Sequence, residues 1–337
     1  MIRGFGSMCF HQQSRGRCGE AGRFGASSSV QCARNGAKRS RLARGRARWS
    51  VLLLLFLVEL VLAAPEAARV AYLAVDAEGY WQVWCMESGG QEPTQVTHTA
   101  YDKSRVSWYP DGQALLVNGN QGELARVDLE TGDETPIQLE LDGMNDAVLS
   151  PDGRYIAFSL STSGSIDDNN IWIVDADGSD LRKLTNKRFL QHDPAWSSDS
   201  GSIYFLSGRG DQAHDIWRYE LGTGSLEQLT AGQLYHFDVA PAPGSHGEPR
   251  LAFSANRSGN YEVWVWSPGT EPRQLTDHPA LDARPNWSPD GVSLLFESSR
   301  GGTLNIWRMP AEGGEPVPVT VHTAGARMPV WYQGGAR

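Results

Sequence analysis

Tryptophan recurs at a regular spacing along this chain. Four copies follow the same short context, in SRVSWYPDG, HDPAWSSDS, RPNWSPDG and MPVWYQGG, and two further copies of the context hold leucine or alanine at that position. The aligned positions are Trp108, Leu149, Trp196, Ala240, Trp287 and Trp331, which lie 41, 47, 44, 47 and 44 residues apart. A repeat of about 40–50 residues built from short strands is typical of one blade of a β-propeller.

Each repeat is predicted to form four short strands. An apolar run follows each turn of the Pro-Asp-Gly type, as residues 114–119 follow Pro110-Asp111-Gly112. Proline fixes φ, aspartate bonds back to the turn, and glycine accepts a positive φ, so the first two strands form a hairpin. A fourth strand closes each repeat. Five of the third strands carry an aligned tryptophan of their own: Trp84, Trp172, Trp217, Trp264 and Trp307.

The tryptophans of these two registers account for nine of the 12 in the chain. Large flat side chains at equivalent positions suit the packing between twisted sheets, where aromatic residues bury the most area. We therefore expect them to be core residues rather than a platform on which a ligand stacks.

The two ends of the repeat region predict how the ring closes. After a leader, the chain opens on a second strand, residues 70–75, and it finishes on an isolated first strand, residues 329–332. One blade must then combine both termini, which removes the open edge between the first and last blades. The prediction for residues 65–337 is an all-β, six-bladed propeller of four-stranded antiparallel blades, closed by pairing the C-terminal strand with the N-terminal blade.

The combined pattern, xPxWSPDGxxIxFxS followed by xIWxxxxxG and xxLT, resembles the repeat of the TolB-like β-propellers, which is seen also in prolyl-oligopeptidase relatives. The resemblance covers essentially all of residues 69–332. It implies a propeller fold and a docking role for one face of the ring. TolB has an α/β domain before its propeller, and we expect the propeller alone here.

Residues 1–64 differ from the rest in charge. They hold 11 basic and two acidic residues, and a stretch rich in glycine, serine and arginine precedes the apolar run 51–62. This order is that of a basic, disordered segment followed by a signal peptide cleaved after Ala63 or Ala64. The run is shorter than the roughly 20 residues that cross a bilayer, although a retained anchor is the alternative. The expectation is a periplasmic or secreted protein without a stable membrane span.

Residues 65–337 hold 19 basic and 37 acidic residues, a balance of −18. This charge argues against nucleic acid and anionic membranes as partners, and it favours cationic ligands or simple solubility. Cys85 is the one cysteine of this part, so no internal disulfide is expected. We expect a monomeric propeller.

Polar residues recur just before the tryptophan register of the first strands. The segments that join one blade to the next cross one face of a propeller, so these positions are expected to line a mouth of the central channel. The residues predicted to bind there are Ser104, Arg105, Asn145, Asp146, His192, Asp193, His236, Asp238, Arg284 and Arg327.

His192 and His236 occupy equivalent positions in neighbouring repeats. Two imidazoles that face one channel can bind a divalent metal, with Asp193 or Asp238 as a further ligand or as an orienting group. The alternative is a row of polar side chains that line a wet channel and bond to loop backbone, with no cofactor.

The sequence contains no G-x-S-x-G elbow, H-E-x-x-H helix, phosphate-binding glycine loop or C-x-x-C pair. The leading hypothesis is an exported, non-enzymatic binding or scaffold module that docks a protein or glycan partner of the cell envelope at one face of the channel. The alternative is a metal-dependent, sugar-active enzyme resembling uronic-acid lyases, centred on His192 and His236.

Overall fold

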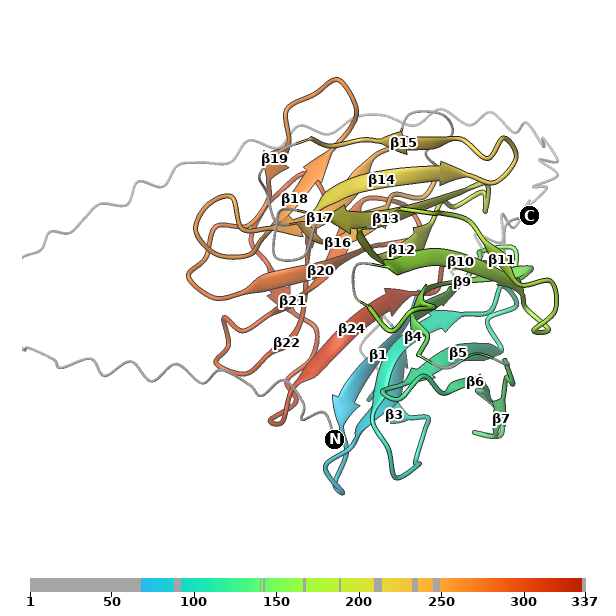
Figure 1. Cartoon of the computed structure of the whole chain (residues 1–337). Coiled ribbons are helices and arrows are strands. Elements are labelled where there is room, and N and C mark those ends of the chain that lie inside the picture. Colours follow the sequence, from blue (N-terminus) through green and yellow to red (C-terminus); the bar gives the residue numbers. More distant parts are fainter. Residues whose placement is uncertain are drawn as a thin grey trace, which may run out of the picture. The chain divides into compact units, whose positions relative to one another are not determined.

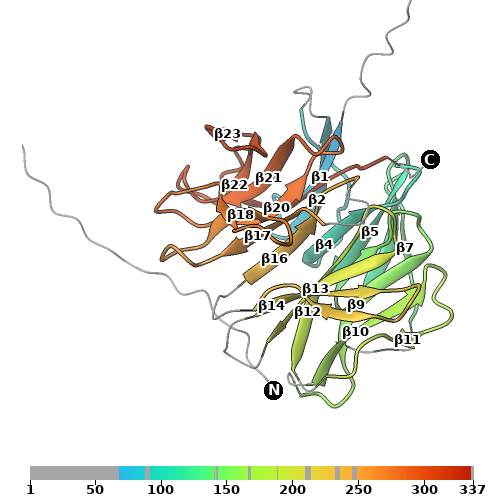
Figure 2. The same ribbon diagram turned by 90° about the horizontal axis from the view of Figure 1, so that it is seen from above.

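The computed structural model describes residues 68–334, apart from residues 88–91, 140, 142, 166–167, 188, 209–213, 232–235 and 245–248 and the side chains of His236 and Phe237. The leader predicted for residues 1–64 lies outside this range and stays a prediction. The described residues form six separate four-stranded antiparallel sheets, arranged around a common axis (Figures 1 and 2). Within them, no helix has the length and apolar character needed to span a bilayer.

The first three blades, numbered from the N-terminus, have the following strands from the axis outward. Blade 1 contains β24 (Ala326–Trp331), β1 (Arg69–Val75), β2 (Trp81–Glu87) and β3 (Thr94–Gln95). Blade 2 contains β4 (Lys103–Trp108), β5 (Ala114–Gly119), β6 (Leu124–Asp128) and β7 (Glu134–Pro136). Blade 3 contains β8 (Asn145–Leu149), β9 (Tyr155–Ser161), β10 (Asn169–Asp175) and β11 (Arg182–Lys183).

The other three blades repeat this order. Blade 4 contains β12 (Leu190–Trp196), β13 (Ser202–Gly208), β14 (Asp215–Glu220) and β15 (Leu226–Gln228). Blade 5 contains β16 (His236–Pro241), β17 (Leu251–Ala255), β18 (Glu262–Trp266) and β19 (Arg273–Gln274). Blade 6 contains β20 (Asp282–Trp287), β21 (Ser293–Ser298), β22 (Asn305–Pro310) and β23 (Val317–Pro318).

The predicted ring closure is confirmed. Strand β24, from the C-terminal end, pairs antiparallel with β1, with Trp331 opposite Val70 and Ala326 opposite Ala74 (Figure 1). No blade therefore leaves its inner strand without a partner, and the last blade in the sequence meets the first across a packed seam.

The Ser-Pro-Asp-Gly turns are organised by the serine hydroxyl. Ser150 Oγ donates to Asp152 Oδ1 at 2.6 Å and accepts the backbone N–H of Tyr155 at 3.0 Å. Gly153 follows with a φ of 74°, a conformation that glycine adopts without a steric penalty. The same pair of serine bonds recurs in blades 4 and 6, which explains why the motif repeats in the sequence.

The Leu-Thr pair of the fourth strand also has a repeated structural role. In blade 5, Thr276 Oγ1 accepts the N–H of Val263 at 2.9 Å and donates to Glu262 Oε2 at 2.6 Å. The threonine thus ties the short outer strand to the start of the third strand. The equivalent threonines of four other blades accept the same backbone bond: Thr97, Thr185, Thr230 and Thr320.

Buried apolar residues gather at each seam between neighbouring blades. Indoles of the first strands cross three of these seams, each donating to a carbonyl of the preceding blade. The bonds run from Trp108 to Val330 at 3.1 Å, from Trp196 to Val148 at 3.1 Å and from Trp287 to Ala240 at 2.9 Å.

The core prediction for the tryptophans is correct in part. Four of the nine are buried: Trp196, Trp264, Trp287 and Trp331. The other five are half-buried: Trp84, Trp108, Trp172, Trp217 and Trp307. Except for Trp108, these five belong to third strands, which lie far from the axis, where an outer strand of two or three residues covers little of them. Basic side chains cover several of these rings instead, as Lys183 does on Trp172.

Candidate functional site

Each inner strand carries an irregularity close to the channel. Its register against the second strand shifts once in all six blades, for example between His192 and Ala195 of β12 and between Ala283 and Asn286 of β20. A β-bulge of this kind leaves an extra residue unpaired and redirects its side chain. The bulges fall on the predicted polar positions, so they bring charged side chains to the axis.

Several bulge residues have a left-handed backbone. Asp146, Asp193, Arg284 and Met328 have φ values of 58°, 52°, 54° and 56°. Such values are uncommon outside glycine, and their clustering is a feature of functional sites. The repetition in four blades shows that the geometry belongs to the repeat itself.

Arg105 of blade 2 reaches two other blades. Its Nη1 lies 2.7 Å from Asp193 Oδ1 of blade 4 and 3.6 Å from Asp146 Oδ1 of blade 3, and its Nη2 donates to the Pro194 carbonyl at 3.3 Å. One guanidinium therefore joins three blades at the axis.

Arg284 of blade 6 makes the corresponding contacts on the other side. Its Nη1 lies 3.1 Å from Asp238 Oδ1 of blade 5, and its Nε lies 3.6 Å from Glu297 Oε1. Glu297 Oε1 also accepts the N–H of Met328 at 2.7 Å, and Asp238 Oδ2 accepts the N–H of Arg284 at 3.1 Å. We call the set Arg105, Asp146, Asp193, Asp238, Arg284 and Glu297 the charged floor.

The carboxyl groups of the charged floor differ in proton affinity. Burial raises the pKa of Glu297 to about 7, despite the opposing effect of Arg284 and the Met328 N–H. Burial also raises the pKa of Asp238, while Arg284 acts in the opposite direction. Burial acts in the same sense on Asp193, but the His192 hydrogen bond and the Arg105 charge outweigh it and hold that pKa well below its usual range. Asp193 is therefore the most firmly ionised of the three.

His192 lies beside the charged floor and uses both ring nitrogens. Its Nδ1 is 3.2 Å from Asp193 Oδ2, and its Nε2 is 2.9 Å from Nδ1 of His214. Burial lowers the pKa of His192, but the hydrogen bond and charge of Asp193 more than compensate, so the net shift is upward.

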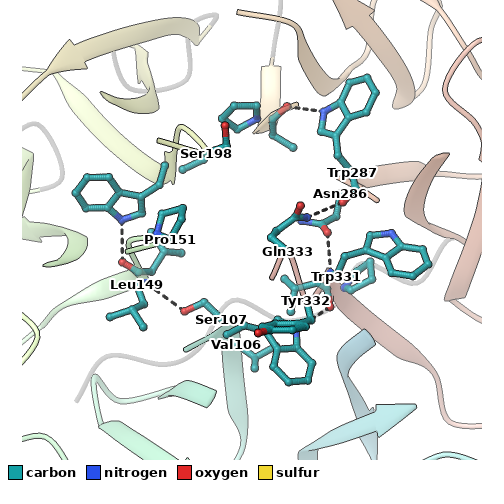
Figure 3. Close-up of a pocket in the computed structure, with 18 of the residues that line it drawn as sticks. Val106, Ser107, Leu149, Pro151, Ser198, Asn286, Trp287, Trp331, Tyr332 and Gln333 are labelled. Carbon is teal, nitrogen blue, oxygen red and sulfur yellow. Dashed lines mark hydrogen bonds between the residues drawn. The ribbon is translucent and has the colours of Figure 1, made fainter. Parts of the chain in front are cut away.

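A cavity of about 390 Å³ lies on the axis next to the charged floor (Figure 3). All six inner strands line it, with residues that lie at or after their bulges. Its base is formed by Arg105, Asp193, Asp238 and Arg284. Its wall is largely proline, aromatic and aliphatic. We call it the turn-end cavity, because it lies at the end of the channel where the Ser-Pro-Asp-Gly turns are.

The structure separates the predicted site residues into groups. Arg105, Asp193, Asp238 and Arg284 line the turn-end cavity, and Asp146 contacts Arg105. Ser104, Asn145, His192 and Arg327 precede the bulges and do not line it. The side chain of His236 lies outside the described set. A binding role for the ten predicted residues stays a prediction. The cavity itself lies at the turn end of the inner strands, whereas the predicted channel mouth lies at their other end, where each blade is joined to the one before it.

Three residues of this region were missed from the sequence: Glu297, Asn286 and Gln333. Glu297 belongs to a second strand, where the apolar pattern gave no reason to look for a channel group. Asn286 and Gln333 line the cavity beside the seam between blades 6 and 1. The position just before the tryptophan register is apolar in four repeats, so the asparagine in RPNW was a usable signal.

Sequence comparisons place the chain near one family of propellers. A family model described as the TolB beta propeller domain matches residues 232–337. An uncharacterized protein of Agrobacterium fabrum is 28% identical over 197 residues, covering 57% of this chain and 64% of that protein. A TolB homolog of Chlorobium chlorochromatii is 30% identical over 149 residues, covering 44% of this chain and 32% of that protein. The chain thus spans less than two thirds of either relative.

Structural comparisons agree on the fold. TolB from Acinetobacter baumannii superposes with a TM-score of 0.68 at 23% identity, covering 79% of this chain and 66% of that one. An oligogalacturonate lyase in complex with manganese superposes with a TM-score of 0.56 at 16% identity, covering 76% and 75%. At these identities the likeness concerns the arrangement of blades.

Proposed function

This chain belongs to the TolB-like β-propeller family, and on that premise we propose that it is an exported, non-enzymatic binding module that docks a protein partner at the turn-end cavity. The observation that carries the proposal is the cavity itself. It is lined by all six inner strands, it has a largely apolar wall, and it ends on a few charged groups that are paired with their neighbours. Pockets with these properties are the usual binding sites of folded proteins.

Charge and location support the same proposal. A balance of −18 in residues 65–337 disfavours nucleic acid and anionic membranes. The apolar run 51–62 supports export to the periplasm or beyond, where the partner would be an envelope protein. A glycan of the envelope is the alternative ligand, and the experiment below distinguishes it from a protein.

The proposal is tested by photo-crosslinking at the two ends of the channel. A photoreactive residue replaces Ser198, which lines the turn-end cavity, or Asn145, which is exposed before the bulge of β8. Cells that make the protein are irradiated, and adducts are treated with protease or glycosidase. We expect a protease-sensitive adduct at Ser198 and none at Asn145. Adducts at Asn145 alone, or at neither position, would contradict the proposal.

A metal-dependent, sugar-active enzyme is the second candidate, and the contact between His192 and His214 is the observation that favours it. Two imidazole nitrogens meet there, and Asp193 orients one ring as carboxylates do in metal sites. Within the described residues, however, no three histidine, cysteine, aspartate or glutamate side chains gather to hold an ion. The described side chains of the site therefore offer fewer ligands than a catalytic zinc site requires, and the side chain of His236 lies outside them.

Metal analysis of the purified protein decides between the two candidates. The enzyme hypothesis predicts a stoichiometric divalent ion in the wild type that is lost in His192→Ala and in His214→Ala. A wild type free of metal after dialysis against manganese or zinc would remove this candidate and leave the binding module.

A further inference from the structure

We infer that the turn-end cavity receives an uncharged peptide segment, whose apolar side chain enters the channel while its backbone amide bonds to Asn286 and Gln333. This inference rests on the proposed function and specifies the chemistry of its ligand. It follows from the two unlike sides of the cavity, the composition of its base, and the state of the aromatic rings around it.

The cavity is polar on one side and apolar on the other. Asn286 and Gln333 lie together at the seam between blades 6 and 1, and Leu149 and Pro151 of blade 3 lie across the opening from them (Figure 3). A ligand that fits must therefore present hydrogen-bonding groups on one flank and an apolar surface on the other. An extended peptide has this character at every residue.

The two amides complement a peptide group. Asn286 Oδ1 accepts the N–H of Trp331 at 2.9 Å, and Gln333 Nε2 donates to the Trp287 carbonyl at 2.8 Å. These bonds fix the orientation of both side chains. The other half of each amide can still form a hydrogen bond: the NH₂ group of Asn286 can donate one, and the carbonyl oxygen of Gln333 can accept one. A peptide group offers one acceptor and one donor in return.

The base of the cavity favours a ligand whose inserted end is uncharged. Arg105 is paired with Asp193, and Arg284 with Asp238, so both signs of charge are compensated within the protein. A buried charge on the ligand would lose its hydration without gaining an uncompensated partner. The wall adds little polarity, since Pro151, Pro194, Pro285 and Pro329 line it and proline has no N–H.

Most of the aromatic rings that line the cavity already have one face covered by another side chain, which disfavours a sugar. Arg69 lies over the rings of both Trp108 and Tyr332, with its Cζ at 5.1 and 4.6 Å from their centroids. Arg250 covers Trp287 at 4.7 Å, and Trp196 stacks with Tyr155. A sugar ring needs an open aromatic face, whereas an apolar side chain requires only the proline and aliphatic wall.

The test uses capped tripeptides and methyl NMR of the whole mature protein. The probes are N-acetyl-Gly-X-Gly-amides with X as Phe, Leu, Lys or Glu, and cellobiose serves as the neutral sugar. We expect Phe and Leu to shift the methyl signals of Leu149 and Val330 and to bind at least tenfold more tightly than Lys or Glu. Equal binding by all four peptides, or shifts with cellobiose alone, would overturn the inference.

Two variants locate the binding. Gln333→Ala removes an exposed side chain and should weaken the Phe peptide several-fold. Gln113→Ala, at an exposed turn position that does not line the cavity, is the matched control and should leave binding unchanged. If the Phe peptide bound Gln333→Ala as tightly as the wild type, the inference would also be refuted. If no peptide binds but the crosslink at Ser198 persists, the ligand class is wrong and the docking site stands.

Discussion

At the scale of single residues, the channel is held by groups that reach across blade seams. The indole of Trp287 donates to Ala240, and the carboxyl of Glu297 accepts the N–H of Met328. The first contact is buried and the second partly so, and each satisfies a polar group that folding takes out of water. Their effects on stability differ because one is neutral and the other titrates.

Replacing Trp287 with Phe tests the indole bond. The Ala240 carbonyl then loses its indole donor inside a packed seam but keeps its strand pairing with Ala252, so the cost is that of one hydrogen bond, about 0.5–1.5 kcal/mol. Trp331→Phe is the matched control, because the Trp331 indole N–H is buried with no partner in the part of the chain that the structure describes. Urea denaturation should show Trp287→Phe to be the more destabilising by about 1 kcal/mol. Equal losses would show that ring volume alone matters.

Glu297 predicts a pH dependence of stability. Its pKa rises to about 7 in the folded protein from an ordinary value of 4.5, so folding favours the protonated form. Its contribution is therefore fully present below about pH 4.5 and is lost as the pH rises through 7, with an upper limit on the order of 3 kcal/mol. In Glu297→Gln this loss between pH 5 and 8 should disappear, as measured by thermal melts across that range. The exposed Glu130→Gln should keep the wild-type profile, and an unchanged profile in Glu297→Gln would contradict the assignment.

At the scale of elements, turns and strands could be read closely from the sequence, whereas the site could be read only in part. The Ser-Pro-Asp-Gly turns and the apolar run 293–298 correspond to observed elements, because local bonds and side-chain alternation specify them. The inner strand of blade 1 begins at Ala326, before the predicted residue 329, because a bulge at Met328 interrupts the pattern. Bulges also decide which polar positions face the cavity, and no sequence signal separated Asp238, which lines it, from Arg327, which does not.

The fourth strand should depend on its threonine. Thr276→Val keeps the shape of the side chain but removes both bonds, leaving the Val263 N–H and the buried Glu262 carboxyl without that hydroxyl. A loss of about 1–3 kcal/mol is expected in denaturant titrations. Thr276→Ser retains the hydroxyl and should recover most of it. If the valine and serine variants were equally stable, the threonine would be acting through packing alone.

At the scale of the whole molecule, the fold depends on the pairing of its two ends. Strand β24 brings Trp331 into the seam between blades 6 and 1, and it covers the inner edge of β1. The ring closure was predictable because the sequence shows that the repeats of residues 65–337 open on a second strand and finish on a first strand. The location of the cavity was not, since it depends on how far each side chain extends across the axis.

Removal of residues 326–337 should abolish cooperative folding. The deletion exposes the edge of β1, and an unpaired edge strand promotes association with other chains. Differential scanning calorimetry should show no cooperative transition, and light scattering should show oligomers. Added peptide 323–334 should restore the transition, and deletion of 335–337 alone should have little effect. A truncated protein that melts like the full one would rule out closure as the source of stability.

Occlusion of the channel at either end is the measurement that tests the binding account most directly. Ser198→Trp fills the turn-end cavity, and Asn145→Trp places the same bulk at the other end of the inner strands. Formaldehyde crosslinking in cells that make each variant reports partner adducts under native conditions. The account predicts that Ser198→Trp loses the adducts of the wild type and Asn145→Trp retains them. Loss with Asn145→Trp and retention with Ser198→Trp would place the partner at the opposite face and contradict it.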